Sequence, residues 1–205
     1  RWIALVFEHP EDDARWYERR DTIWWDGDES RKAEFTAEMF ENAGRHLARF
    51  SDEQLENGLR FFLSQGYAFD ALDADVPLPA RVRLVRAVPG LYRGIFAPRC
   101  HELDFGGNLP LYRICYMFWE SIPVGGRPES EEERTLGREM LAALREILEI
   151  DNPMCQYSAL HGLGHARPDW PVEVEEMIDA YLSRQPRADF PLRTYALAAR
   201  EGHVQ

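Results

Sequence analysis

The segment that decides the fold is residues 152–184, NPMCQYSALHGLGHARPDWPVEVEEMIDAYLSR. Asn152 followed by Pro153 is typical of a helix start, because an asparagine side chain caps free backbone amides and proline fits the first turn. Asp169 and Pro171 then open a second helix. The apolar residues of that second helix recur at helical spacing and define one buried face, made of Val174, Met177, Ile178, Tyr181 and Leu182. The segment therefore predicts two antiparallel helices joined by a short turn.

The N-terminal half of the chain continues this helical pattern. Apolar residues at helical spacing predict an amphipathic helix over about 30–50. Ser51 and Gln54 then form a capping box, in which the serine hydroxyl accepts from a free amide and the glutamine reaches back. The helix that this box opens is expected to end at Gly66. Residues 2–7 (WIALVF) are the one segment that favours a strand.

The middle of the chain contains the most apolar segment. Residues 81–99 predict two short helices broken at Pro89-Gly90, because both residue types disfavour a helix interior. Leu111–Trp119 (LYRICYMFW) is apolar on nearly every side, which is typical of a central, buried helix. Further helices are predicted over about 130–150 and 191–201.

These elements predict an all-α fold in which antiparallel helix pairs stack as an irregular array within a single domain, residues 1–205. The expected parts are a Trp-rich N-terminal cap over 1–29, helix pairs over 30–66, 79–101, 109–150 and 152–184, and a C-terminal capping helix over 190–202. The order of parts in 152–184 resembles a HEAT-type helical repeat, where a first helix ends in small residues and a second begins with valines. This resemblance implies a HEAT-like array with a curved surface that binds other macromolecules.

Composition limits the partners and the location. The formal net charge is −12, from 36 acidic against 24 basic residues, and such a surface repels nucleic acids and anionic membranes. A basic protein is therefore the expected partner. The longest apolar run, around 114–119, is too short to cross a bilayer. The three cysteines are an odd number at wide spacing, which predicts no disulfide framework and favours a reducing cytoplasm.

The motif HGLGH, residues 161–165, raises the question of a metal site. His161 and His165 are four residues apart, so they lie on one side of a helix and can present nitrogens to one ion. A zinc protease helix would carry a glutamate where Gly162 stands, so that activity is excluded. The missing ligands would come from the segment Cys100–Asp104, with His101 and Glu102 as the candidates.

The structural alternative to a metal site is that the two glycines of HGLGH let another helix approach closely, while the histidines cap the helix end. This alternative is preferred, so no metal and no cofactor are expected. A cysteine nucleophile is a further alternative, and Cys100, Cys115 and Cys155 are the candidates. Cysteine is commonly a small buried hydrophobe, and no recognisable signature surrounds these three, so no catalytic residue is assigned.

Acidic runs and tryptophans are the candidate binding features. Asp26, Asp28 and Glu29 form one acidic turn beside Trp24-Trp25, and tryptophan is enriched at binding hot spots. Glu131 and Glu132 belong to a second run, within a capping box that Ser130 and Glu133 provide. The structural alternative for both acidic runs is a solvated helix face. The structural alternative for the N-terminal tryptophans is that they cover the end of the core.

The function expected from these features is a non-enzymatic protein-binding module, with a bacterial toxin-neutralising (immunity) protein as an analogy in size and acidity. Its contact residues would be Trp24, Trp25, Asp26, Asp28, Glu29, Glu131 and Glu132. The alternative is a metal-dependent enzyme that uses His161 and His165.

Overall fold

A computed structural model describes residues 2–13, 16–18, 28–64, 70–103, 109–120, 122, 128–184 and 190–204. The α-helices are α1 (Trp2–Phe7), α2 (Glu29–Glu41), α3 (Ala43–His46), α4 (Asp52–Ser64), α6 (Leu78–Leu91), α7 (Ala97–Arg99), α8 (Tyr112–Met117), α9 (Glu131–Leu148), α10 (Pro153–Ala166), α11 (Pro171–Arg184) and α12 (Phe190–Arg200). Two 3₁₀ turns, η1 (Trp16–Glu18) and η3 (Phe118–Glu120), and one π-helix, η2 (Tyr92–Phe96), complete the described elements. No strand occurs among the described residues, so the predicted all-α fold is confirmed.

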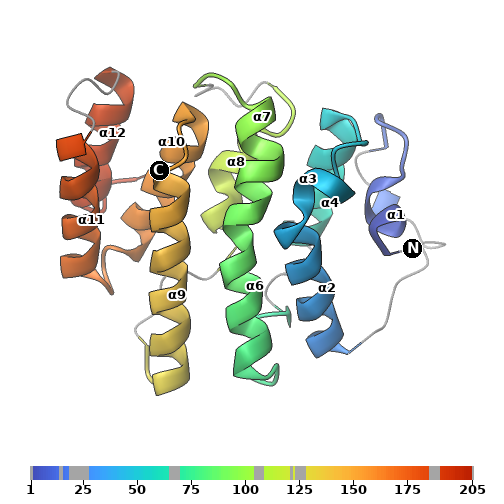
Figure 1. Ribbon diagram of the computed structural model, residues 1–205, viewed down its shortest axis with the longest axis horizontal. Coiled ribbons are helices and arrows are strands. Elements are labelled where there is room, and N and C mark those ends of the chain that lie inside the picture. Colours follow the sequence, from blue (N-terminus) through green and yellow to red (C-terminus); the bar gives the residue numbers. More distant parts are fainter. Residues whose placement is uncertain are drawn as a thin grey trace.

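The helices lie in two layers (Figure 1). In one layer α2, α6 and α9 lie side by side. In the other layer α4 contacts α8, α8 contacts α10, and α10 contacts α12. At one end of the array α1 packs against α4, and at the other α11 packs against α12 and α10. The helices therefore pack side by side along the molecule, whereas their division into the predicted antiparallel pairs and membership of the HEAT type stay predictions.

Ion pairs show how neighbouring helices of the first layer run. Three arginines of the α6–η2 segment pair with glutamates spaced seven residues apart on α9, namely Arg81–Glu132, Arg86–Glu139 and Arg93–Glu146. Both partners advance along the chain together, so α6 and α9 are parallel. In contrast, α9 and α10 are an antiparallel pair, because Gly162 meets Leu144 while Gln156 donates to the Ile150 carbonyl oxygen.

Several local predictions are confirmed. The Ser51 and Gln54 capping box forms in both directions, with distances of 3.3 and 3.2 Å. The Ser130 capping box is also complete. The central segment is largely buried, with Phe118 and Trp119 at no more than 1% exposed, although it divides into α8 and η3 and leaves Tyr116 half-buried.

Three predictions are wrong. Residues 2–7 form helix α1 instead of a strand, and its Phe7 ring packs over Gly58 of α4. The helix predicted over 30–50 breaks at Asn42, between α2 and α3. Helix α6 runs through Pro89-Gly90 without a break, because this stretch is buried and a Cβ at Gly90 would lie 2.4 Å from the Phe40 carbonyl oxygen. Tertiary packing here outweighs the low helix propensity of both residues.

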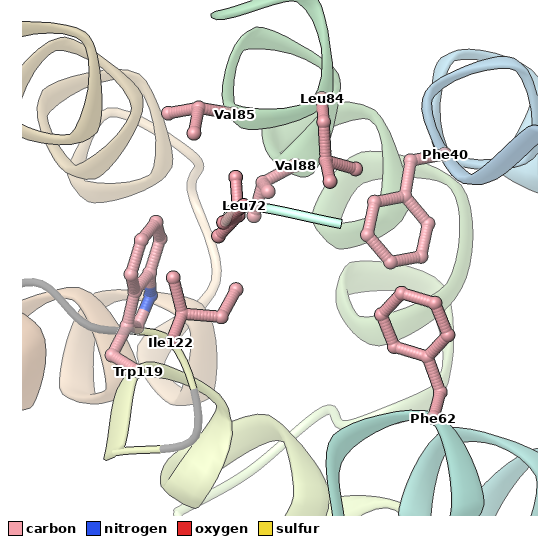
Figure 2. A pocket seen from close by; sticks show the side chains of 8 residues that line it. All are labelled: Phe40, Phe62, Leu72, Leu84, Val85, Val88, Trp119 and Ile122. Carbon is pink, nitrogen blue, oxygen red and sulfur yellow. The ribbon is translucent and has the colours of Figure 1, made fainter. Parts of the chain in front are cut away.

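The two layers enclose an apolar core. Figure 2 shows a small internal cavity of about 10 Å³, lined by Phe40, Phe62, Leu72, Leu84, Val85, Val88, Trp119 and Ile122. This volume matches about one water molecule, and an apolar void of that size stays dry. The cavity is therefore a packing defect and not a ligand site.

Candidate metal centre

Helix α10 carries the HGLGH motif and is fixed firmly at its start. The Asn152 side chain accepts from the Cys155 amide at 2.9 Å and donates to the carbonyl oxygens of Ala97 and Cys100 at 3.1 and 2.8 Å. One asparagine thus caps α10 and joins it to the end of α7. The cap that the sequence predicts is present, and it sets the position of the histidines two turns later.

The two glycines of the motif allow close helix packing. A Cβ at Gly162 would lie 2.7 Å from Leu144 and 2.8 Å from Trp119, and one at Gly164 would lie 2.4 Å from Val204. The structural interpretation is therefore confirmed for Gly162, whose neighbours belong to α9 and η3, whereas Gly164 packs against Val204, which follows α12. The same close approach brings η3, which follows α8, against α10, so that Glu120 reaches the histidines.

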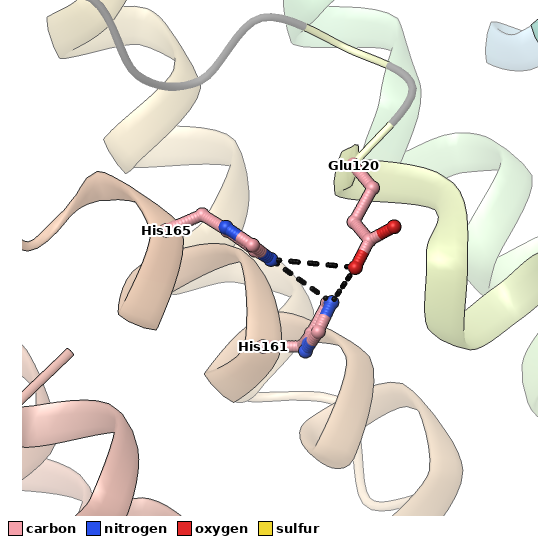
Figure 3. Close-up of side chains that lie close together, drawn as sticks. All are labelled: Glu120, His161 and His165. Carbon is pink, nitrogen blue, oxygen red and sulfur yellow. Dashed lines mark hydrogen bonds and ion pairs between the residues drawn. The ribbon is translucent and has the colours of Figure 1, made fainter. Parts of the chain in front are cut away.

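Three ligand atoms converge at this contact (Figure 3). Glu120 Oε1 lies 3.1 Å from His161 Nε2 and 3.6 Å from His165 Nε2, and the two histidine nitrogens are 3.2 Å apart. Among the described residues, this is the one group of three or more His, Cys, Asp or Glu side chains whose ligand atoms all lie close together. The predicted capping of the helix end by the histidines is not what their contacts show, because their hydrogen bonds and ion pairs go to Tyr195, to Glu120 and to each other.

The three side chains of the site differ in exposure. The His161 side chain is 0% exposed, whereas His165 and Glu120 are 38% and 35% exposed. Burial lowers the pKa of His161, and the neighbouring His165 lowers it further, while Glu120 opposes both effects. His161 is consequently biased towards the neutral imidazole, which is the form that binds a metal ion.

A row of tyrosines supports the buried histidine from the side opposite Glu120. The Tyr195 hydroxyl of α12 lies 2.6 Å from His161 Nδ1, and the Tyr116 hydroxyl of α8 lies 3.0 Å from that of Tyr195. The Tyr157 ring lies between them, with ring-centroid distances of 4.8 Å to Tyr116 and 4.2 Å to Tyr195. Burial raises the pKa of both Tyr157 and Tyr195, so these hydroxyls stay protonated.

The donor set and spacing fit a tetrahedral ion. Zinc binds histidine nitrogen and carboxylate oxygen at about 2.0–2.2 Å, so two ligand atoms of a regular tetrahedron are about 3.3–3.5 Å apart. The three observed separations of 3.1, 3.2 and 3.6 Å bracket this range. Among the described residues, no fourth His, Cys, Asp or Glu side chain joins the group.

The residues predicted to complete a metal site lie elsewhere. His101 and Glu102 are exposed and do not belong to the three-residue group. The sequence interpretation missed Glu120, which stands directly after the apolar segment Leu111–Trp119. The available signal was a carboxylate directly after this apolar segment, but nothing in the sequence pairs it with a histidine 41 residues later.

The three cysteines lie in the core of the protein. Cys100, Cys115 and Cys155 are buried free thiols. Burial raises the pKa of Cys115 well above its usual range, and its two cysteine neighbours raise it further, so the thiolate is disfavoured. This environment is that of a small hydrophobe.

The predicted partner-binding residues take part in local contacts where the structure describes them. Asp28 caps α2 by accepting from the Arg31 amide, and Glu29 pairs with Lys32. Glu131 pairs with Arg134 and Arg138, and Glu132 pairs with Arg81. All of these hydrogen bonds and ion pairs join residues of the same chain. Trp24, Trp25 and Asp26 lie outside the described residues.

Comparison with known proteins gives no family. No family model, curated protein or solved structure matches the chain. In the described part of the chain, no helix is both long and apolar enough to cross a membrane. Functional inference therefore depends on the chemistry of the site itself.

Proposed function

We propose that the protein binds a divalent transition-metal ion, best zinc, through Glu120, His161 and His165, and acts as a metal-dependent enzyme. The observation that carries this proposal is the triangle of His161 Nε2, His165 Nε2 and Glu120 Oε1, with sides of 3.1, 3.2 and 3.6 Å. Imidazole and carboxylate donors together are a set that zinc accepts.

Hydrogen bonding alone accounts poorly for the triangle. A neutral imidazole nitrogen either carries one proton or presents one lone pair. His161 Nε2 faces two partners at once, so a proton there bonds well with only one of them, and a lone pair there faces the acceptor Glu120. A cation between the three atoms satisfies all of them together.

The number of protein ligands favours catalysis over a purely structural role. Structural zinc sites usually have four protein ligands, whereas catalytic sites have three and keep a position open. Glu120 and His165 are partly exposed, so the open position faces solvent. A metal ion in such a site lowers the pKa of bound water to about 7, which is the chemistry of metal-dependent hydrolysis.

The test is metal analysis of protein purified without a histidine tag, followed by zinc titration calorimetry. We expect one zinc ion per chain and loss of binding in His165→Ala and Glu120→Gln, whose side chains are exposed enough for the fold to survive. The control is His203→Ala, because His203 is exposed outside the three-residue group. Absence of zinc binding, or equal binding by all variants, would contradict the proposal.

The catalytic part has its own test. Hydrolysis of activated carboxylic and phosphate esters should require the ion, stop after chelation and return when zinc is added. Glu120→Gln should abolish the activity while His203→Ala retains it. Stoichiometric zinc with no hydrolysis of any ester would leave metal binding standing and remove the enzyme class.

The protein-binding role expected from the sequence remains a second proposal. Its support is that Asp28 and Glu131 keep 68% and 70% of their side chains exposed despite their local ion pairs. Association with a basic partner, found by pull-down, should slow as salt rises, because such attraction is screened over about 8 Å at physiological salt. A salt-independent association rate would remove the electrostatic part of this role.

A further inference from the structure

The second ring nitrogen of His161 has a partner that the ligand triangle does not use. His161 Nδ1 lies 2.6 Å from the Tyr195 hydroxyl, whereas Glu120 contacts the other ring nitrogen, Nε2. A histidine that binds metal through Nε2 must carry its proton on Nδ1. The group next to Nδ1 therefore decides whether that tautomer is stable in a buried place.

We infer that Tyr195 is a positioning residue for the metal ion: its hydroxyl oxygen accepts the Nδ1–H of His161 and fixes both the tautomer and the ring orientation. This inference rests on the proposed function. Metal-binding histidines usually donate their other N–H to an outer partner, and loss of that partner weakens metal affinity about 10–100-fold.

A hydroxyl differs from the usual carboxylate partner because it both donates and accepts. In the metal-free site, Tyr195 donates to Nδ1 while His161 donates from Nε2 to Glu120 Oε1, 3.1 Å away. If an ion bound, Nε2 would release one proton to solvent and Nδ1 would take up one proton from solvent, so His161 would stay neutral and the number of bound protons would not change. Tyr195 then accepts from Nδ1 and turns its own proton towards the Tyr116 hydroxyl, 3.0 Å away.

This exchange keeps both ring nitrogens of His161 paired. His161 is 0% exposed, so an Nδ1–H without a partner would disfavour this tautomer. The aromatic neighbours hold the hydroxyl in place, since the Tyr195 ring packs on Tyr157 at 4.2 Å and the Tyr116 ring packs on His161 at 4.2 Å. Tyr195 and Tyr116 thus act together, with Tyr195 as the direct contact.

The decisive variant is Tyr195→Phe, which keeps the ring and removes the hydroxyl. We expect its zinc Kd to rise about 10–100-fold. Tyr181→Phe is the matched control, because it removes a buried hydroxyl that donates to Gln156 Oε1 in another part of the core. Its zinc Kd should equal that of the wild type. Tyr116→Phe should weaken zinc binding less than Tyr195→Phe, because it removes only the outer acceptor.

A second readout reports the tautomer directly. In ¹⁵N-histidine-labelled protein saturated with zinc, the NMR spectrum of the wild type should show a slowly exchanging Nδ1–H on His161. The same proton should exchange faster in Tyr195→Phe at saturating zinc. A change confined to folding stability would not move this signal.

The outcomes separate the two proposals. A wild-type protein that binds zinc, with Tyr195→Phe matching it in both Kd and Nδ1–H exchange, would overturn the role of Tyr195 and leave the metal site intact. A Tyr116→Phe variant weaker than Tyr195→Phe would also overturn it. A wild-type protein without zinc affinity would overturn the proposed function and this inference together.

Discussion

Glu120 and His161 lie 41 residues apart in the chain, yet their Oε1 and Nε2 atoms are separated by 3.1 Å. Glu120 ends the 3₁₀ turn after α8, and His161 lies in the middle of α10. The contact joins η3, directly after α8, to the middle of α10 in the second layer. An ion held there would link the two helices, so metal binding and folding stability should be coupled.

Zinc should therefore raise the melting temperature. A ligand at 100 times its Kd stabilises the folded state by about 2.7 kcal/mol. For a chain of 205 residues this corresponds to a rise of roughly 5–10 °C, at about 2–4 °C per kcal/mol. Calorimetry with and without zinc measures the shift, and a chelator should reverse it. The same shift in Glu120→Gln would show that the ion binds elsewhere.

Gly162→Ala should destabilise the protein although alanine is the better helix former. The added Cβ would lie 2.7 Å from Leu144 and 2.8 Å from Trp119, and Trp119 is buried and cannot retreat. Overpacking costs about 1–3 kcal/mol, against a helix gain of about 0.5–1 kcal/mol. Chemical denaturation should show a net loss.

Gly44→Ala is the control for this substitution. Its nearest neighbour atom would be 3.6 Å away, at Gly94, which is an ordinary contact. We expect Gly44→Ala to be neutral or slightly stabilising. If Gly162→Ala were equally stable, the close approach between α10 and η3 would be looser than described.

Phe118→Ala should be among the most damaging core substitutions. The ring is 0% exposed and packs against Phe40, Tyr92 and Phe96 with centroid distances of 6.2, 5.6 and 6.4 Å. Truncating a buried phenylalanine costs about 3–5 kcal/mol. Urea unfolding measures the loss, with Phe35→Ala, at a position 45% exposed, as the control. A Phe118→Ala midpoint equal to that of Phe35→Ala would place η3 outside the core.

The sequence predicts the features that depend on neighbouring residues or on apolar periodicity, such as helix caps and buried helix faces. The caps at Ser51, Ser130 and Asn152 use side chains within three residues of the amides they satisfy, so their patterns are readable without the fold. The continuous helix through Pro89-Gly90 was not predictable in this way. There Gly90 lies close to the carbonyl oxygen of Phe40, about fifty residues earlier in the chain, and a local pattern does not reveal such a contact.

In the metal centre, too, the local part can be predicted from the sequence, whereas the contacts between distant segments cannot. The spacing of His161 and His165 places both on one helix face, and the sequence shows this directly. Glu120 joins them only because Gly162 allows η3 to pack closely, and Tyr195 arrives from α12. Periodicity gives the face on which a residue lies, but it does not give which helices become neighbours.

The Arg86–Glu139 pair between α6 and α9 predicts a pH-dependent part of the stability. Arg86 donates to both carboxylate oxygens of Glu139, at 2.7 and 2.6 Å. This hydrogen bonding lowers the pKa of Glu139 below its ordinary value of 4.5, and it outweighs partial burial, which raises the pKa. Because the folded-state pKa is lower than the unfolded one, the pair stabilises the fold fully above pH 4.5 and loses its effect as the pH falls through the folded value.

Glu139→Gln should therefore melt slightly below the wild type at pH 7, and the difference should shrink as the pH falls below 4.5. The expected difference is small, because Arg86 is well exposed and surface ion pairs contribute little. Thermal unfolding at a series of pH values from neutral to acidic measures it, and Glu34→Gln on the exposed side of α2 is the control, with no pH-dependent difference expected. A Glu139→Gln deficit that stays constant or grows towards low pH would mean that the carboxylate is not held by Arg86 in solution, and that α6 and α9 keep their parallel register through apolar contacts alone.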